Sequence, residues 1–210
     1  MNKEKAIKTL DEIKDMMSRS SQFQALSGWS IVIIGIFASV ATVVAAAIIG
    51  LDMPFLHESH ALVPVNVRIW TAILLALALF IVCAATVTIM SYYKAKRHNL
   101  PFIADRRMFK MATNFMIPLV TGGILSLAMI LQGHYGLTSS IMLIFYGLAL
   151  VGCQHYTYPS LRFLGYGEIV LGLINCFIIH YALLFWFIGF GVLHIVFGFI
   201  YMILYEKKTR

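Results

Sequence analysis

Residues 27–50 read SGWSIVIIGIFASVATVVAAAIIG, a stretch that contains no charged side chain. A helix needs about 20 mostly apolar residues to cross the hydrocarbon core of a bilayer, so this stretch is long enough to span a membrane. Five further apolar runs of comparable length follow, at 68–92, 113–132, 138–154, 162–181 and 183–205. The sequence therefore predicts an all-α membrane protein with six transmembrane helices, arranged as three antiparallel hairpins.

The composition of the whole chain supports this fold class. Of 210 residues, 60% are hydrophobic and only 12% are charged, whereas soluble domains carry about 25% charged residues. Almost no sequence remains for a soluble domain. We divide the chain into an N-terminal interfacial segment (1–24), a six-helix transmembrane domain (25–206) and a short tail (207–210).

Lysine and arginine are distributed unevenly between the two sides of the predicted bundle. Fifteen of the 16 lie before span one, between spans two and three, at the start of span five or after span six, and only Arg68 lies on the other side. Cytoplasmic loops of membrane proteins retain positive charge. The distribution predicts that both termini are cytoplasmic, and it accounts for the net charge of +7 without nucleic-acid binding.

Two segments are predicted on the cytoplasmic side. Ala6, Leu10, Ile13 and Met17 recur at helical spacing among charged residues, which is typical of an amphipathic helix lying on the membrane. This helix is either an anchoring collar or a docking site for a partner protein. The segment 93–112, which contains a cluster of basic residues, is predicted to be the largest inner loop.

Few residues carry an enzymatic or metal-binding pattern. His57, Glu58 and His60 in the predicted outer loop are a weak candidate set of metal ligands, since imidazole and carboxylate groups bind divalent ions. Their spacing differs from the HExxH helix of metalloproteases, and an ordinary solvated loop is the simpler interpretation. No nucleophile elbow, phosphate loop or dinucleotide fingerprint is present. We expect neither catalytic residues nor a cofactor.

Glycines recur seven residues apart in three of the predicted spans, at Gly28 and Gly35, Gly165 and Gly172, and Gly191 and Gly198. Small residues let helix backbones approach closely in lipid. We therefore interpret Gly165, Gly172, Gly191 and Gly198 as helix-packing positions.

Glu168 is an acidic residue inside an apolar span. At about 100° per residue it shares a helix face with Gly165, Gly172 and Asn175, and His194 in span six lies between glycines in the same way. With a turn near Ala182, Glu168 and His194 differ in depth by only about 3 Å at a rise of about 1.5 Å per residue. We expect Glu168 to face the bundle interior and to contact span six at or near His194.

The energetic cost of Glu168 leaves several interpretations open. A charged carboxylate near mid-bilayer costs about 2.5 to 3.5 kcal/mol, and an interhelical hydrogen bond returns about 0.6 to 2 kcal/mol. Glu168 is therefore protonated, paired with a charged His194, or reached by water through a cavity. It is either a polar contact that joins two helices, or part of a proton, ion or ligand site with His194 and Asn175.

Several stretches support a resemblance: MSRSSQFQALSG, IPLVTGGI, LIFYGLALVG, LGYGEIVLGLI and LLFWFIGFGVLHIVFGFIYMILYEKK. Over nearly its full length the chain resembles a family of small uncharacterised six-helix proteins of the bacterial inner membrane, whose genes often lie beside that of a winged-helix regulator. The resemblance implies a bacterial source and a multi-pass topology, and it places Glu168 and His194 in recurring stretches. It implies no activity.

Two functions from different classes follow. The first is a small transporter or a ligand- or proton-responsive protein with a polar pocket between spans five and six, whose partner is a small molecule or ion. The second is a non-catalytic membrane partner or regulatory anchor that binds another protein through the N-terminal helix and the 93–112 loop. An enclosed contact at Glu168 favours the second function, and a water-accessible vestibule favours the first. Neither function fixes an oligomeric state.

Overall fold

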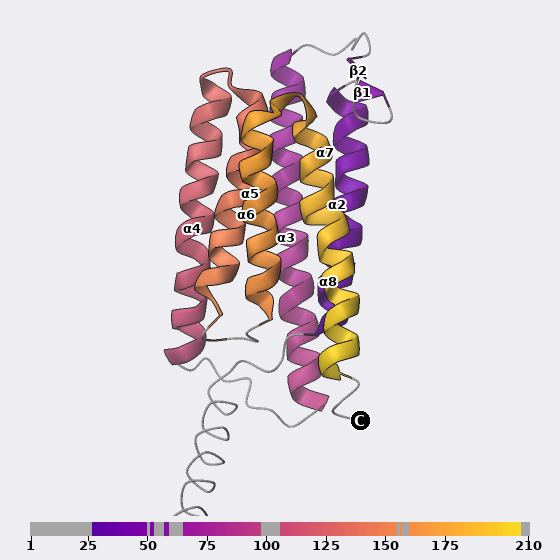
Figure 1. Cartoon of the computed structure of the whole chain (residues 1–210), viewed down its shortest axis with the longest axis vertical. Coiled ribbons are helices and arrows are strands. Elements are labelled where there is room, and N and C mark those ends of the chain that lie inside the picture. Colours follow the sequence, from indigo (N-terminus) through magenta and orange to yellow (C-terminus); the bar gives the residue numbers. More distant parts are fainter. Residues whose placement is uncertain are drawn as a thin grey trace, which may run out of the picture.

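The computed structural model describes residues 27–49, 51–52, 57–58, 65–97, 106–154, 156 and 160–206. The predicted amphipathic helix in residues 1–24, the tail 207–210 and His60 lie outside these residues. The described part consists of upright helices and one pair of two-residue strands (Figure 1). It confirms the all-α class.

The helices begin with α2 (Gly28–Ile49), α3 (Val65–Arg97), α4 (Arg106–Leu131), α5 (Tyr135–Gly152) and α6 (Leu161–Phe177). The C-terminal helix is continuous, but its helix type changes along its length. It follows the 3₁₀ turn η1 (Ile179–Tyr181) and consists of α7 (Ala182–Trp186), the π-helix η2 (Phe187–Leu193), α8 (His194–Tyr201) and the π-helix η3 (Met202–Glu206).

Five helical stretches are long and apolar enough to cross a membrane: Gly28–Ile48, Ile69–Arg97, Phe109–Leu131, Tyr135–Gly152 and Ile179–Leu204. These stretches are compatible with a multi-pass membrane protein. The remaining long helix, α6, has 17 residues. At a rise of about 1.5 Å per residue it is about 26 Å long, somewhat shorter than the roughly 30 Å hydrocarbon core.

Several helix ends differ from the predicted spans. The segment expected as a loop at 93–112 is largely helical, because α3 continues to Arg97 and α4 begins at Arg106. Lysine and arginine are good helix formers, so a helix continues beyond its apolar part. The turn between α6 and α7 also lies earlier than the predicted position near Ala182, since α6 ends at Phe177. The turn residues Ile178 and Ile179 are apolar, and hydropathy does not separate them from the helix.

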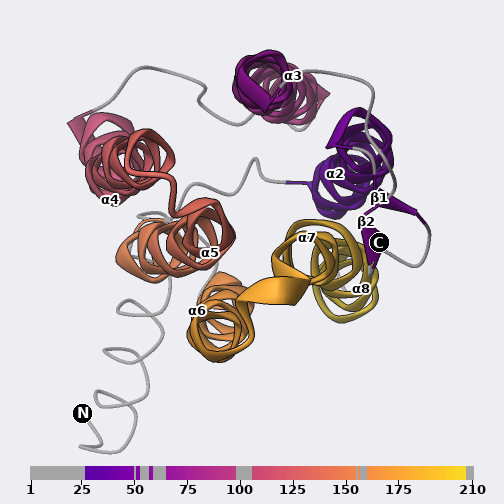
Figure 2. The same cartoon turned by 90° about the horizontal axis from the view of Figure 1, so that it is seen from above.

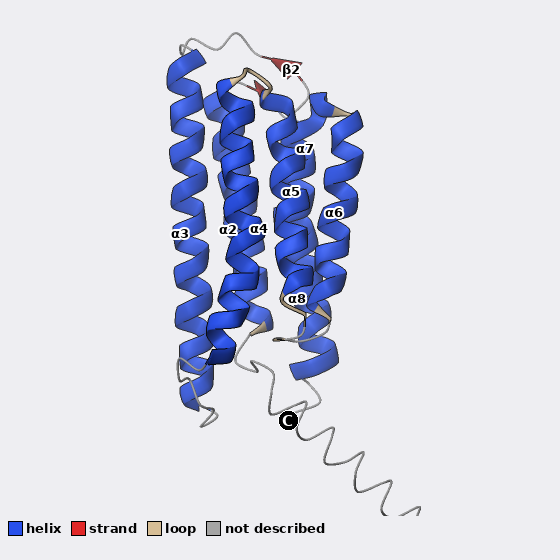
Figure 3. Cartoon of the chain, turned by 90° about the vertical axis from the view of Figure 1, so that its left-hand side faces the viewer, coloured by secondary structure: helices blue, strands red, loops and turns tan. Residues whose placement is uncertain are grey.

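Seen along the bundle axis, the helices follow the order α3, α2, α7 with α8, α6, α5 and α4 around the bundle (Figure 2). In space, α2 packs against α3 and α8, while α5 packs against α4 and α6. A side view shows the same upright arrangement, with the strand pair at one end (Figure 3). In that pair, β1 (Leu51–Asp52) runs antiparallel to β2 (His57–Glu58).

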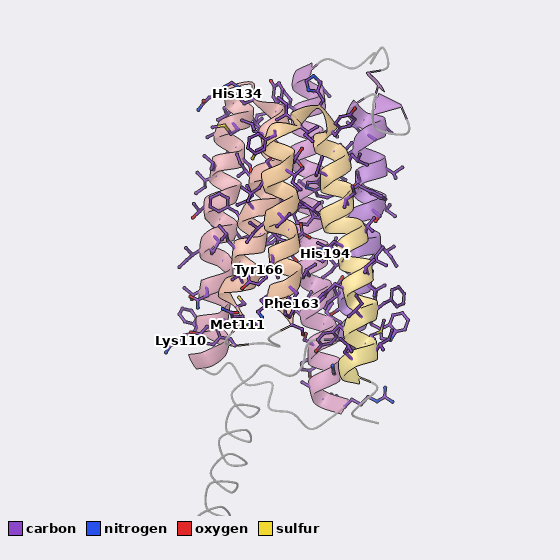
Figure 4. All side chains as sticks on the ribbon, in the orientation of Figure 1. Lys110, Met111, His134, Phe163, Tyr166 and His194 are labelled. Carbon is purple, nitrogen blue, oxygen red and sulfur yellow. The ribbon has the colours of Figure 1, made fainter. Side chains whose placement is uncertain are left out.

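The two ends of the bundle differ in charge. His134 lies at one end and Lys110 at the other, and His194 lies between them (Figure 4). We call these the His134 end and the Lys110 end. The described basic residues Lys94, Lys96 and Arg97 belong to the last turn of α3, and Lys110 lies in the second turn of α4. The Lys110 end is therefore the basic one.

Candidate functional site

Glu168 on α6 is completely buried, with 0% of its surface exposed. The first turn of α8 brings His194 to it, and the His194 Nδ1 atom lies 3.3 Å from the Glu168 Oε1 atom. His194 is 1% exposed. The contact expected between Glu168 and span six is therefore present, and both groups face the interior.

The hydrogen bonds of His194 determine where one of its protons sits. Nδ1 lies 3.0 Å from the Gly189 carbonyl oxygen, and a carbonyl only accepts, so Nδ1 carries a hydrogen. Nε2 lies 2.8 Å from the Tyr146 hydroxyl. That hydroxyl donates to Nε2 when the imidazole is neutral, and it accepts from Nε2 when the imidazole is charged.

The carboxylate of Glu168 is poorly compensated. His194 Nδ1 donates its hydrogen to the Gly189 carbonyl oxygen. Neither Glu168 oxygen has a hydrogen-bond partner among the described residues. The 3.3 Å separation is therefore a close electrostatic contact and not a well-aligned hydrogen bond. A buried charge of this kind is costly unless it is paired, and the Glu168 and His194 pair is neutral only when it holds one titratable proton.

Gly189 makes room for this arrangement. A methyl group at Gly189 would collide with Leu143 and would lie 2.6 Å from the Glu168 Oε2 atom. Gly189 belongs to the π-helix η2, and π-helical turns occur frequently at functional sites. Gly189 cannot be recognised as a site residue from the sequence, because glycine is common in membrane helices and its spacing to Gly191 carries no distinct pattern.

Tyr146 on α5 is the second residue that the sequence analysis missed. Its ring lies 5.4 Å from the His194 ring and 5.1 Å from the Phe190 ring, and Phe190 lies 4.9 Å from Trp186. An aromatic cluster thus extends from the site to Trp186 on α7. A tyrosine inside an apolar run was the available signal, but a hydroxyl in a span also fits an ordinary packing residue.

Asn175 does not join Glu168 and His194 directly. It lies two helical turns further along α6, is 0% exposed, and neither of its amide atoms has a hydrogen-bond partner in the described part of the chain. The polar pocket predicted between spans five and six is thus an enclosed contact in this structure.

The four predicted packing glycines all lie in tight contacts, but these contacts are with α5 and α2 and not between spans five and six. Gly165 packs on Gly147 and Leu150 of α5 and Gly172 on Ser140 and Ile144, so these glycines face α5 and not span six. Gly191 contacts Ser39 of α2, and Gly198 contacts Val32 and the backbone of Gly28. Spacing identifies a close-packing face and does not identify the helix that it meets.

The outer-loop metal candidates gain no support. Strand pairing places Asp52 opposite His57 and Leu51 opposite Glu58. Among the residues that the structure describes, no group of three or more His, Cys, Asp and Glu side chains could hold a metal ion.

Comparisons with known proteins give no relative from which a role could be taken. No protein-family model matches the chain, and no curated protein or solved structure matches it significantly.

Proposed function

We propose that this protein is a proton-responsive integral membrane protein of the bacterial inner membrane, in which Glu168 and His194 form the proton-binding site. The observation that carries the proposal is a fully buried carboxylate 3.3 Å from an imidazole nitrogen, with no hydrogen-bond donor to either oxygen among the described residues. Ionisable groups inside membrane helices are expensive, and they mark proton or ligand sites more often than surface groups do.

Charge balance explains how the site would respond to pH. The pair is neutral with one shared proton, either as an uncharged carboxyl beside a neutral imidazole or as a carboxylate beside an imidazolium. Removing that proton leaves an uncompensated negative charge, and adding a second leaves a positive one. Both changes are costly in a closed site, so each must be accompanied by opening of the site to water.

Burial argues for a response to protons rather than transport of a larger solute. Glu168, Asn175 and His194 are 0%, 0% and 1% exposed, which leaves no open vestibule beside them. A proton is small enough to bind between the packed helices, whereas a larger ligand would require the helices to separate. We infer a non-catalytic role, in keeping with a sequence that contains no nucleophile elbow, phosphate loop or dinucleotide fingerprint.

The proposed topology is six spans in three hairpins, with both termini in the cytoplasm. It is supported by the basic Lys110 end and by the positive charge that cytoplasmic segments retain. It includes α6 as a short fifth span. A Ser59→Cys variant free of other cysteines should react with an impermeant thiol reagent from the outside. Reaction only from the cytoplasmic side would contradict this topology.

Tryptophan fluorescence gives a direct test of proton binding. Trp186 contacts the aromatic cluster at the site, and Trp29 and Trp70, which are more than half exposed, can be changed to Phe. In this background, purified protein should show a transition in Trp186 emission as pH rises and the shared proton leaves. Glu168→Gln should abolish the alkaline transition, because the site then stays uncharged, while the acid transition due to His194 persists.

Control variants at other titratable residues distinguish protonation of the Glu168 and His194 site from protonation elsewhere in the protein. Glu58→Gln and His180→Gln should leave both transitions unchanged, and every tyrosine is retained in all of these proteins. An identical alkaline transition in wild type and Glu168→Gln would reject the proton site and leave Glu168 as a structural contact between helices.

A second function is favoured by the same enclosure. A closed contact at Glu168 is also what a non-catalytic partner protein would show. The exposed Lys96, Arg97 and Lys110 side chains, with the partly exposed Lys94, offer a basic surface at one end. In this alternative, a protein partner binds through the N-terminal segment and residues 93–112. Deleting residues 2–17 would then abolish partner binding and leave the fluorescence transitions intact.

A further inference from the structure

Polar atoms without a protein partner are concentrated along one side of the α5 and α6 interface. They are both carboxylate oxygens of Glu168, both amide atoms of Asn175 and the Ser140 hydroxyl, each without a hydrogen bond to any described residue. All three side chains are 0% exposed. Buried polar groups are almost always paired with protein or with ordered water, so this concentration requires an explanation.

These atoms follow a line along α6. Glu168 and Asn175 are seven residues apart, which places them about 20° apart around the helix and about 10 Å apart along it. Ser140 lies level with Gly172, between them, because a methyl group at Gly172 would lie 2.9 Å from the Ser140 carbonyl oxygen. The line therefore runs from Glu168 past Ser140 to Asn175.

The two directions from Glu168 differ in chemistry. Toward the His134 end, the line reaches Asn175, which is only two residues from the end of α6 at Phe177. Gly165 packs closely on α5 toward the Lys110 end, as Gly172 does on the other side, where a methyl group would lie 2.9 Å from the Ser140 carbonyl oxygen. A methyl group at Gly165 would lie 2.7 Å from the Gly147 carbonyl oxygen and 3.1 Å from the Leu150 Cβ atom. Leu150 and Leu164 there are 4% and 2% exposed. Apolar side chains therefore adjoin Glu168 on the Lys110 side, and buried atoms without a described partner recur there at Ser160 and Arg162, near the start of α6.

Local hydrogen bonding cannot satisfy these groups. The Ser140 hydroxyl could rotate toward a carbonyl one turn earlier, as the Ser39 and Thr42 hydroxyls do. A carboxylate and a carboxamide cannot both do so, because Glu168 lacks a donor when it is ionised and Asn175 needs both a donor and an acceptor. Water fills such sites when each molecule has two to four polar partners.

We infer that a file of bound water molecules connects Glu168, by way of Ser140, to Asn175 near the His134 end of the bundle. That the proton reaches Glu168 and His194 along this file of water rests on the proposed function. The titratable side chains in contact at the inner end of the route are His194 of α8 and Tyr146 of α5.

Radiolytic footprinting tests the water file in the wild-type protein. Hydroxyl radicals formed by X-rays from bound water modify side chains next to that water, even when the side chains are buried. Leu143 and Leu150 are a matched pair on α5, 0% and 4% exposed. Leu143 lies beside Glu168 at Gly189, whereas Leu150 lies at Gly165. Leu143 should be modified severalfold faster than Leu150, and equal rates would overturn the inference.

Two variants localise the water. Asn175→Leu and Ser140→Ala remove polar partners with little change in shape, and each should lower the Leu143 rate toward that of Leu150. Ile174→Leu, next to Asn175 but 43% exposed, should leave the rate unchanged. If Leu143 labelling persists in Asn175→Leu, water reaches Glu168 by another route, and the inferred route is wrong. The alkaline fluorescence transition is measured separately. Its absence alone would reject the proton function and would not contradict the inferred water file.

Discussion

The C-terminal helix, which includes η2 and α8, joins the bundle by two different means: a glycine interface with α2, and the contact of His194 at the start of α8 with Glu168 of α6. At the first, Gly28 and Gly35 of α2 lie against Gly198 and Gly191, and backbones approach closely. The polar side chains of α2 bond within their own helix there, as Ser39 does to Gly35. At the second, a carboxylate and an imidazole meet in the buried interior.

The difference separates what holds the helices together from what the molecule can use. Close packing through small residues is the main source of helix association in lipid, and the α2 and α8 interface already supplies it. The Glu168 contact adds a charge that costs more than a single hydrogen bond returns. Because the glycine interface already holds the helices together, the costly Glu168 contact is consistent with a functional role.

The largest expected effect comes from breaking the glycine interface. In Gly35→Ala, the new methyl group would lie 2.8 Å from the Gly191 carbonyl oxygen and 2.9 Å from the Ile195 backbone nitrogen. Backbone atoms cannot rotate away, so the helices must separate, at a cost of about 1 to 3 kcal/mol. Thermal unfolding in detergent should show a clear loss of stability.

Gly123→Ala is the matched control for this change. A methyl group at Gly123 on α4 has no atom within 4 Å, and alanine favours a helix over glycine by about 0.5 to 1 kcal/mol. This variant should be as stable as wild type or slightly more stable. Equal stability of Gly35→Ala and Gly123→Ala would remove the distinction between the two interfaces.

A smaller effect is expected at the polar contact. Glu168→Gln and His194→Gln should each lower the unfolding temperature, and the double variant should lose less than the sum, because either change removes the shared interaction. Coupling between contacting residues typically amounts to about 0.5 to 3 kcal/mol. His134→Gln, at an exposed position, replaces His194→Gln in a control cycle, where the losses should add. Strict additivity of Glu168→Gln and His194→Gln would show that the two side chains are not coupled.

The features that depend on length and depth could be predicted from the sequence. Apolar run length identified the helices, and equal depth on neighbouring helices brought Glu168 to His194. Both follow from the regular rise of a helix, which is a local property.

The features that depend on the neighbouring helix could not be predicted. Gly165 and Gly172 meet α5, because a small-residue face accepts any helix with a complementary surface, and Ser140 and Gly147 of α5 supply one. Tyr146 reaches His194 from α5, a helix that the hairpin argument did not include. The π-helix at Phe187–Leu193 also leaves no periodic signal, since its apolar residues fit an α-helix equally well.

The shortness of α6 has a consequence for the surrounding lipid. Its 17 residues cover about 26 Å, whereas the 33 residues of α3 cover about 50 Å. A short apolar surface is matched by local thinning of the bilayer, and a long one by tilt or by protrusion beyond the bilayer. We therefore expect a thinner annulus of lipid beside α6 than beside α3. The barrier that separates Glu168 from bulk water would then be thinnest on the side of the bundle that carries it.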